Sequence, residues 1–448
     1  MVQQGKDDML LRQARTVLNF NWLGEYTMPG PRLYPHQWSW DAALIAIGYS
    51  HYDQERARSD LRHLFEAQWS NGLLPQIVFN PDFDNYFPGP NFWHANESPF
   101  APKDRQTSGV VMPPVHATGV LAVYRNAKGQ ESAKTFLEYA FPRLVAWHEY
   151  LYRDRDPTGE GLVYIRHPWE SGMDNSPMWD QILQRLQLRA DQIPAYKRVD
   201  TLVAGAAARP TTASYDRFAY LVKFFADRGY DEAKIRQDCP FLVQDVLFNS
   251  LLCRAGTDLA EIARILGEDP QPHEERAGKT KRAIDEKLWD EEHGAYLDYD
   301  LVGDRPLCVY FGPNLTGPLF AGIPDEDRAK RTVDTLENVG FGLSDENVTP
   351  IPSYDMHGFG FDPERYWRGP VWINIDWFLM HGLKRYGYHK QAERLERTIV
   401  DLCRDEGFRE YFDPQTGAGQ GSVLFSWTAA LLIDVLMERA KAESEAQS

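Results

Sequence analysis

The sequence predicts an all-α fold, and three observations lead to that prediction. Apolar residues recur at the spacing of one face of an α-helix, as in Leu395, Ile399, Leu402 and Cys403. Alternation of apolar and polar residues, which is typical of a half-buried strand, is rare and short. The third observation is a turn that begins with Asp and contains Gly, as a ring of helical hairpins would need between helices. It recurs at residues 156–161, 290–298 and 413–419.

The helical pattern divides the chain into about a dozen segments. Some of their starts are marked, since Asp41 suits the first turn of one helix and Pro370 directly precedes another. The helices are expected near residues 7–20, 39–50, 57–65, 114–127, 143–154, 212–228, 242–254, 257–266, 277–288, 325–337, 371–387, 395–403 and 422–439.

Two long segments without helical periodicity interrupt this pattern. Residues 78–108 are rich in Pro, Asn and aromatic residues, and residues 186–210 carry many small residues. Long ordered loops in a compact protein are usually functional, so we expect both to act as lids over a site. No linker divides the chain, and residues 1–448 are therefore expected to form a single domain.

Composition excludes several classes of protein. The net charge of −17, with no basic run, argues against a nucleic-acid partner. The four cysteines show neither CxxC nor metal-ligand spacing, and no GxGxxG follows a strand, so no metal or cofactor is expected. The N-terminus has no signal core and no apolar run spans a membrane, which favours a cytoplasmic protein. A homo-oligomer is left open.

The stretch WESGMDNSP, residues 169–177, raises the question of catalysis. It places Glu170 and Asp174 beside Trp169, whereas acidic surface loops seldom hold a tryptophan. Glycoside hydrolysis needs two carboxyls, one protonated to donate to the leaving oxygen and one to activate water. Glu410, next to Tyr411 and before the last helix, is the candidate partner of Asp174. The alternative is that these acids lie in solvated turns.

Aromatic residues also gather with polar ones at helix starts. YPHQWSWD, residues 34–41, and RYWRGPVW, residues 365–372, each combine rings with a carboxylate or an arginine. Rings of this kind stack on sugars, although core packing explains most aromatic residues in a protein.

These motifs resemble glycoside hydrolase family 63. YPHQWSWD, WESGMDNSP, YWRGPVW and the ending REYFDPQTG…FSWTAALL match in order, from about residue 30 to about 435. The resemblance implies an (α/α)6 barrel that cleaves α-glycosidic bonds with inversion. In its compact length, the chain is most similar to members of the bacterial branch that hydrolyses mannosylglycerate and glucosylglycerate.

The resemblance also implies roles for individual residues. Asp174 would be the general acid and Glu410 the general base, whereas Glu170 is left as a hydroxyl ligand or a supporting group. Met112 stands where the family usually has Gln, which leaves the exact substrate open but not the chemistry. The sequence also does not separate glucosides from mannosides, which differ at one hydroxyl. The positions that would hold the sugar or glycerate are Tyr34, Trp38, Ser39, Trp40, Asp41, Tyr86, Gly172, Arg209, Tyr366 and Trp367.

Two alternatives remain at this point. One is a trehalase-like hydrolase of neutral disaccharides, and the other is a carbohydrate-binding protein that has lost catalysis. A pocket for a carboxylate would separate the first from a glycosylglycerate hydrolase, with Arg209 as the best candidate and Arg105 and Lys103 as others. The presence of both Asp174 and Glu410 argues against the second.

Overall fold

The computed structural model describes residues 2–205, 207–308, 310–338 and 340–447. Within these residues, one set of helices forms an inner ring. Each helix of the ring contacts the next one along the chain, and the last, α17, contacts the first, α2. This inner ring consists of α2 (Ser39–Ser50), α5 (His116–Arg125), α11 (Val246–Leu266), α13 (Gly312–Ala321), α15 (Ile373–Arg385) and α17 (Ser426–Gln447).

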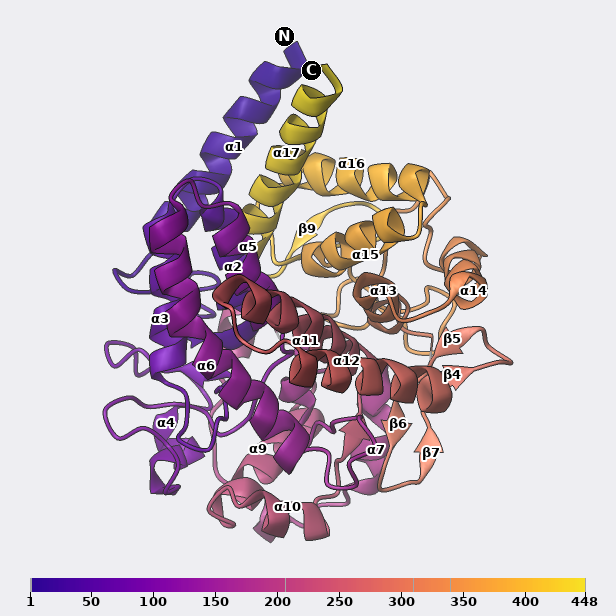
Figure 1. Ribbon diagram of the computed structural model, residues 1–448. Helices are drawn as coiled ribbons and strands as arrows, with labels where there is room; N and C mark the ends of the chain where they lie inside the picture. The colour runs from indigo at the N-terminus through magenta and orange to yellow at the C-terminus, as the bar shows by residue number, and fades with distance from the viewer. Residues whose placement is uncertain (1, 206, 309, 339, 448) are drawn as a thin grey trace.

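An outer helix packs against each inner one (Figure 1). In ring order from α17, the outer helices are α1 (Val2–Asn21), α3 (Gln54–Glu66), α6 (Gln130–Asp154), α12 (Gln271–Ala283), α14 (Glu326–Asn338) and α16 (His389–Asp405). Six such pairs, counted over the described residues, make an (α/α)6 barrel, and the predicted fold class is confirmed.

Burial explains which helices lie inside. Every residue of α2, with the sequence SWDAALIAIGYS, is buried, as expected for a helix that is apolar all round. By contrast, α16 is amphipathic and buries one stripe, which includes Leu395, Ile399 and Cys403. The core of the protein therefore fills the ring and the layer between the two rings.

Glycines allow the inner helices to approach backbone to backbone. A Cβ added at Gly48 of α2 would lie 2.5 Å from the Cα of Ala430 in α17. A Cβ at Gly119 of α5 would lie 2.9 Å from the carbonyl oxygen of Ala43 in α2. Because real Cβ atoms do not approach this closely, these seams require a residue without a side chain.

Further elements lie between the helices of the two rings. They include α4 (Pro90–Trp93), α7 (Asp180–Arg185), α8 (Asp200–Ala204), α9 (Thr212–Ala226) and α10 (Glu232–Asp238). The strands have two residues each and form antiparallel pairs. They are β1 (Gln37–Trp38) with β2 (Ile77–Val78), β3 (Val243–Gln244) with β6 (Tyr299–Asp300) and then β7 (Arg305–Pro306), β4 (Trp289–Asp290) with β5 (Ala295–Tyr296), and β8 (Tyr411–Phe412) with β9 (Gly419–Gln420).

The structure corrects several details of the predicted helices. Helix α6 begins at Gln130 and not near residue 143, since it continues through Pro142. Residues 242–254 and 257–266 were expected to be separate, but α11 runs through Gly256. A Cβ at Gly256 would lie 3.1 Å from that of Ala277 in α12, so this glycine serves helix packing rather than a break. Helix α13 was not predicted because its sequence, GPNLTGPLFA, contains Pro318 within the helix.

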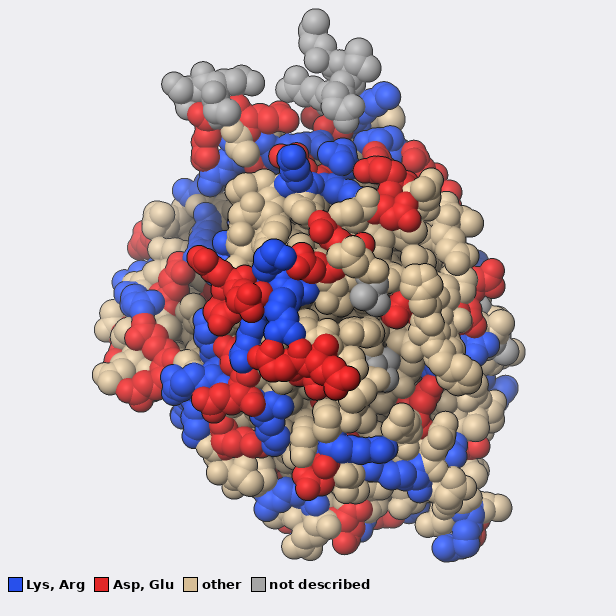
Figure 2. Space-filling view, turned by 90° about the vertical axis from the view of Figure 1, so that its right-hand side faces the viewer, with Lys and Arg blue, Asp and Glu red and all other residues tan. Residues whose placement is uncertain are grey.

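The outer surface mixes both signs of charge. On the face shown in Figure 2, Lys and Arg side chains are interspersed with Asp and Glu. Helix α1 packs along α17, so the first and last described helices lie side by side (Figure 1). No helix in the described ranges has both the length and the apolar character needed to cross a membrane.

Candidate active site

A pocket opens where α2 and α17 begin. Most of the predicted site residues line it, namely Tyr34, Trp38, Trp40, Asp41, Tyr86, Gly172, Asp174, Arg209, Tyr366 and Glu410. The structure thus brings together motifs that lie far apart in the sequence.

Asp174 lies on the turn after the 3-10 helix Pro168–Ser171. Gly172 makes this turn, with φ of +73°, and a Cβ there would lie 2.6 Å from a ring carbon of Trp40. Burial, assisted by the charges of Glu410 and Asp200, raises the pKa of Asp174 to about 7, against the opposing effect of Arg209. This carboxyl can therefore hold a proton near neutral pH.

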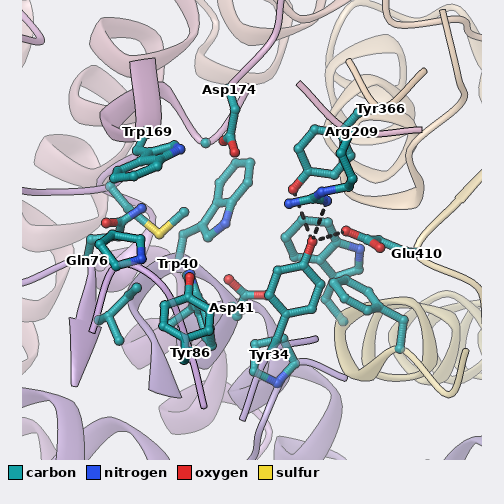
Figure 3. Close-up of a pocket in the computed structure, with 18 of the residues that line it drawn as sticks. Tyr34, Trp40, Asp41, Gln76, Tyr86, Trp169, Asp174, Arg209, Tyr366 and Glu410 are labelled. Carbon is teal, nitrogen blue, oxygen red and sulfur yellow. Dashed lines mark hydrogen bonds between the residues drawn. The ribbon is translucent and has the colours of Figure 1, made fainter. Parts of the chain in front are cut away.

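Glu410 enters the pocket from another side (Figure 3). It directly precedes β8, and its side chain is 1% exposed. The Tyr34 hydroxyl donates to Oε1 at 2.5 Å, and the backbone N–H of Ser422 donates to Oε2 at 2.8 Å. Burial raises the pKa of Glu410, while Arg209 and these two donors oppose the rise. Both carboxylate oxygens are thus held in place.

The Tyr34 hydroxyl connects Glu410 to a buried cation. Arg209 donates from Nη1 to this oxygen at 3.1 Å, and the Tyr366 hydroxyl lies 3.2 Å away. Since Tyr34 gives its one proton to Glu410, Tyr366 is the donor in their contact. The Arg209 guanidinium also lies 4.2 Å from the ring centroid of Tyr366 and donates from Nε to Asp200 at 3.3 Å.

Two predicted residues support the wall and are not among the residues that line it. The Ser39 hydroxyl is buried and hydrogen-bonds with Nε2 of His116 at 2.9 Å. Trp367 is buried and stacks on Trp372, with ring centroids 3.9 Å apart. Direct contact of Ser39 or Trp367 with a ligand stays a prediction.

Arg105 and Lys103, the other candidates for a carboxylate pocket, lie outside the site. Arg105 pairs with Glu66 at 2.5 Å, and Lys103 donates to the carbonyls of Asn96 and Ser98. Of the three candidates, Arg209 lines the pocket.

Glu170 has a structural position. It is fully buried and accepts two hydrogen bonds from Arg155, both at 2.9 Å. The backbone N–H groups of Val111 and Arg166 donate to it at 3.2 and 2.7 Å. These partners hold the turn that carries Asp174, and Glu170 does not line the pocket.

Several residues of the pocket wall were not predicted. Gln76 comes close to Trp38 because β2 pairs with β1, with Ile77 opposite Trp38. Single residues of this kind have no local sequence signal. The further lining residues include Gln76, Trp93, Trp169, Tyr215, Phe425 and Trp427.

In the described part of the chain, one group of three side chains is close enough to share a metal ion: His381, Asp434 and Glu438. These residues belong to α15 and α17 and do not line the pocket. The pocket itself is lined by carboxyls, tyrosine hydroxyls, Arg209, aromatic rings and the side chains of Gln76 and Met112, among others.

A helical barrel whose pocket is lined by many aromatic rings and by the carboxyls of Asp41, Asp174 and Glu410, each with a raised pKa, is the arrangement of a glycoside hydrolase. Residues 34–428 match the family model described as the mannosylglycerate hydrolase MGH1-like glycoside hydrolase domain. The chain belongs to this family and is a glycoside hydrolase, as the sequence motifs predicted.

Individual relatives agree with this membership. The chain is 63% identical to the mannosylglycerate hydrolase of Rubrobacter radiotolerans, over 97% of this chain and 98% of that one. It is 36% identical to the glucosylglycerate hydrolase of Mycolicibacterium hassiacum, over 95% and 97%. A crystal structure of the family 63 mannosylglycerate hydrolase of Thermus thermophilus with Tris and D-glycerate superposes with a TM-score of 0.89, at 41% identity over 95% of this chain and 99% of that one.

Proposed function

We propose that this enzyme hydrolyses α-linked hexosylglycerates, mannosylglycerate or glucosylglycerate, to hexose and D-glycerate with inversion. The observation that carries the proposal is the buried guanidinium of Arg209 in a pocket that also holds Asp174 and Glu410. A guanidinium binds a carboxylate through paired hydrogen bonds, and D-glycerate supplies that carboxylate. The activities of the two curated relatives support the same substrate class.

Asp174 is assigned as the general acid and Glu410 as the general base. The protonated Asp174 donates to the glycosidic oxygen, while Glu410 removes a proton from the water that attacks the anomeric carbon. Inversion requires space for that water, so we expect the two carboxyls to stand roughly 6.5–9.5 Å apart in the substrate complex. Proton NMR of the first product should therefore show the β-anomer of the hexose.

The direct test is incubation with α-mannosylglycerate, α-glucosylglycerate and trehalose, followed by assay of free hexose and D-glycerate. Release from at least one glycosylglycerate but not from trehalose is expected. Hydrolysis of trehalose alone would favour the neutral-disaccharide alternative instead.

We expect kcat/KM to fall as the pH rises through about 7, because burial raises the pKa of Asp174 to about 7 and the general acid acts only when protonated. The acidic limb should lie above the ordinary range of a glutamate, because burial also raises the pKa of Glu410, which acts only when ionised. Initial rates at subsaturating substrate between about pH 4 and pH 9 measure both limbs. Unchanged activity up to pH 9 would contradict the assignment of Asp174.

Arg209→Gln should impair hydrolysis of hexosylglycerate more than that of the matching hexosylglycerol, which lacks the carboxylate. Both substrates should lose some activity, since Arg209 also holds the hydroxyl of Tyr34. The additional loss for the charged substrate should be about 1.5–3 kcal/mol, the range for hydrogen bonds to charged groups. Equal losses in kcat/KM for the two substrates would remove Arg209 from the carboxylate subsite.

The proposal includes a single catalytic domain with lids formed by residues 78–108 and 186–210, of which residue 206 lies outside the described part. Tyr86 and Arg209 support it, because these two segments each contribute to the pocket wall. Tyr86→Ala should raise KM or lower kcat for every accepted substrate, and an effect on one substrate only would contradict a lid. A cytoplasmic location stays a prediction, and the oligomeric state is left open.

A further inference from the structure

Gln76 lies at the edge of β2 with its backbone fixed on both sides. Its N–H donates to the carbonyl of Val110 at 2.7 Å, and its carbonyl accepts from the N–H of Ser39 at 2.9 Å. The pairing of β1 with β2 begins at the next residue, where Ile77 lies opposite Trp38. Because the backbone cannot rotate, the direction in which the Gln76 side chain leaves it is set by the fold.

That side chain carries hydrogen-bonding capacity that the protein does not use. Gln76 is 5% exposed and lines the pocket, and its buried Oε1 has no hydrogen-bond partner among the described residues. Buried polar atoms without a partner are rare because they destabilise the folded protein. Because the Gln76 residue lines the pocket, a ligand hydroxyl can supply a hydrogen bond to its carboxamide that the protein does not supply.

The position of Gln76 indicates which part of the ligand it meets. Figure 3 shows Gln76 and Trp169 on one side of the pocket and Arg209, Tyr366 and Glu410 on the other, with Trp40 and Asp41 between them. If the acid group of the substrate occupies the Arg209 side, the hexose extends toward Gln76. Met112, which also lines the pocket, has no N–H or O–H to donate to a hydroxyl.

We propose that Gln76 binds a hydroxyl group of the hexose and thereby determines which hexose the enzyme accepts. A carboxamide suits this role, since its oxygen accepts from one hydroxyl while its NH₂ group donates to a neighbouring one. Its recognition is neutral, so it distinguishes hydroxyl patterns and not charge. This inference deepens the proposed function and rests on it for the orientation of the substrate.

The test compares Gln76→Met, which keeps the length of the side chain and removes the amide, with the wild type. Binding of D-mannose, D-glucose and D-glycerate is measured separately by calorimetry, and kcat/KM is measured on both hexosylglycerates. Gln76→Met should weaken binding of the preferred hexose by about 5- to 100-fold, the effect of leaving one buried hydroxyl unpaired, and should leave D-glycerate affinity unchanged. Monodeoxy hexoses identify the hydroxyl that Gln76 binds. Gln76→Met should not change the affinity for the deoxy sugar that lacks this hydroxyl.

Gln244→Met is the matched control. Gln244 is 2% exposed and also has an Oε1 without a partner, but it does not line the pocket. The variant Gln244→Met should leave hexose affinity unchanged. If Gln76→Met does not fold, Gln76→Asn retains the amide and withdraws it by one methylene, and the same loss is expected.

Each outcome is decisive. Equal weakening of hexose and D-glycerate, or no weakening of either, would overturn the assignment of Gln76. Failure of the wild type to cleave any hexosylglycerate, together with a selective loss of hexose binding in Gln76→Met, would overturn the proposed function and retain Gln76 as a sugar-binding residue.

Discussion

Asp174→Ala and Glu410→Ala are each expected to lower kcat on hexosylglycerates by about 10²–10⁴-fold, the usual contribution of a general acid or base. The two variants should differ in one respect. A glycoside with an acidic phenol as leaving group needs no protonation, so Asp174→Ala should regain much of its rate on that substrate. Glu410→Ala should not, because activation of water is still required.

The matched control is Asp405→Ala, which removes an exposed carboxylate at the end of α16, outside the pocket. Its kcat should equal that of the wild type. Thermal unfolding of all three variants checks that they are folded. Retention of more than about a tenth of the wild-type kcat by Asp174→Ala or Glu410→Ala would show that the residue concerned is not the acid or base assigned here.

Glu170→Gln should destabilise the folded protein by about 3–5 kcal/mol, the cost of removing one partner from a buried ion pair. Arg155 is fully buried and contacts Glu170 through both terminal nitrogens, and the side chain of Arg166 is also buried beside it. In Glu170→Gln, the guanidiniums of Arg155 and Arg166 lose the charge of Glu170 and retain Glu232 as a charged partner. Chemical denaturation followed by tryptophan fluorescence measures the loss.

Asp154→Asn offers the comparison for Glu170→Gln. Asp154 pairs with Arg153 at 2.6 Å, but the Arg153 side chain is 54% exposed. Asp154→Asn should therefore lower the free energy of unfolding by less than about 1 kcal/mol. Since Glu170 holds the turn of Asp174, kcat of Glu170→Gln at low temperature should fall less than in Asp174→Ala. Equal stability of the Glu170→Gln and Asp154→Asn proteins would contradict the structural role of Glu170.

Periodicity predicted the long helices because each buries a regular stripe or lies wholly inside the barrel. It failed where packing replaces local preference. Helix α13 tolerates Pro318 because its neighbours α11 and α15 enclose it, and Gly256 lies within α11 because α12 packs close to it. No local pattern reports such contacts with distant segments.

The candidate site was predictable where motifs concentrate unusual residues. Asp174, Glu410 and the aromatic starts of α2 and α15 belong to such motifs, and the structure brings them together. Gln76 and Tyr215 line the same pocket, yet each is a single residue in an ordinary context. Their positions depend on the pairing of β1 with β2 and on the placement of α9, which long-range packing decides.

The glycine seams of the inner ring limit how this protein can acquire new substrates. Where Gly48 meets Ala430 and Gly119 meets Ala43, even a methyl group would push two helices apart. The radius of the barrel is therefore fixed, and so is the width of the barrel where the pocket opens. New substrates therefore have to be accommodated by the segments that line the pocket outside the inner helices. A variant library confined to residues 76–112 and 198–215 would sample new specificities on an intact scaffold.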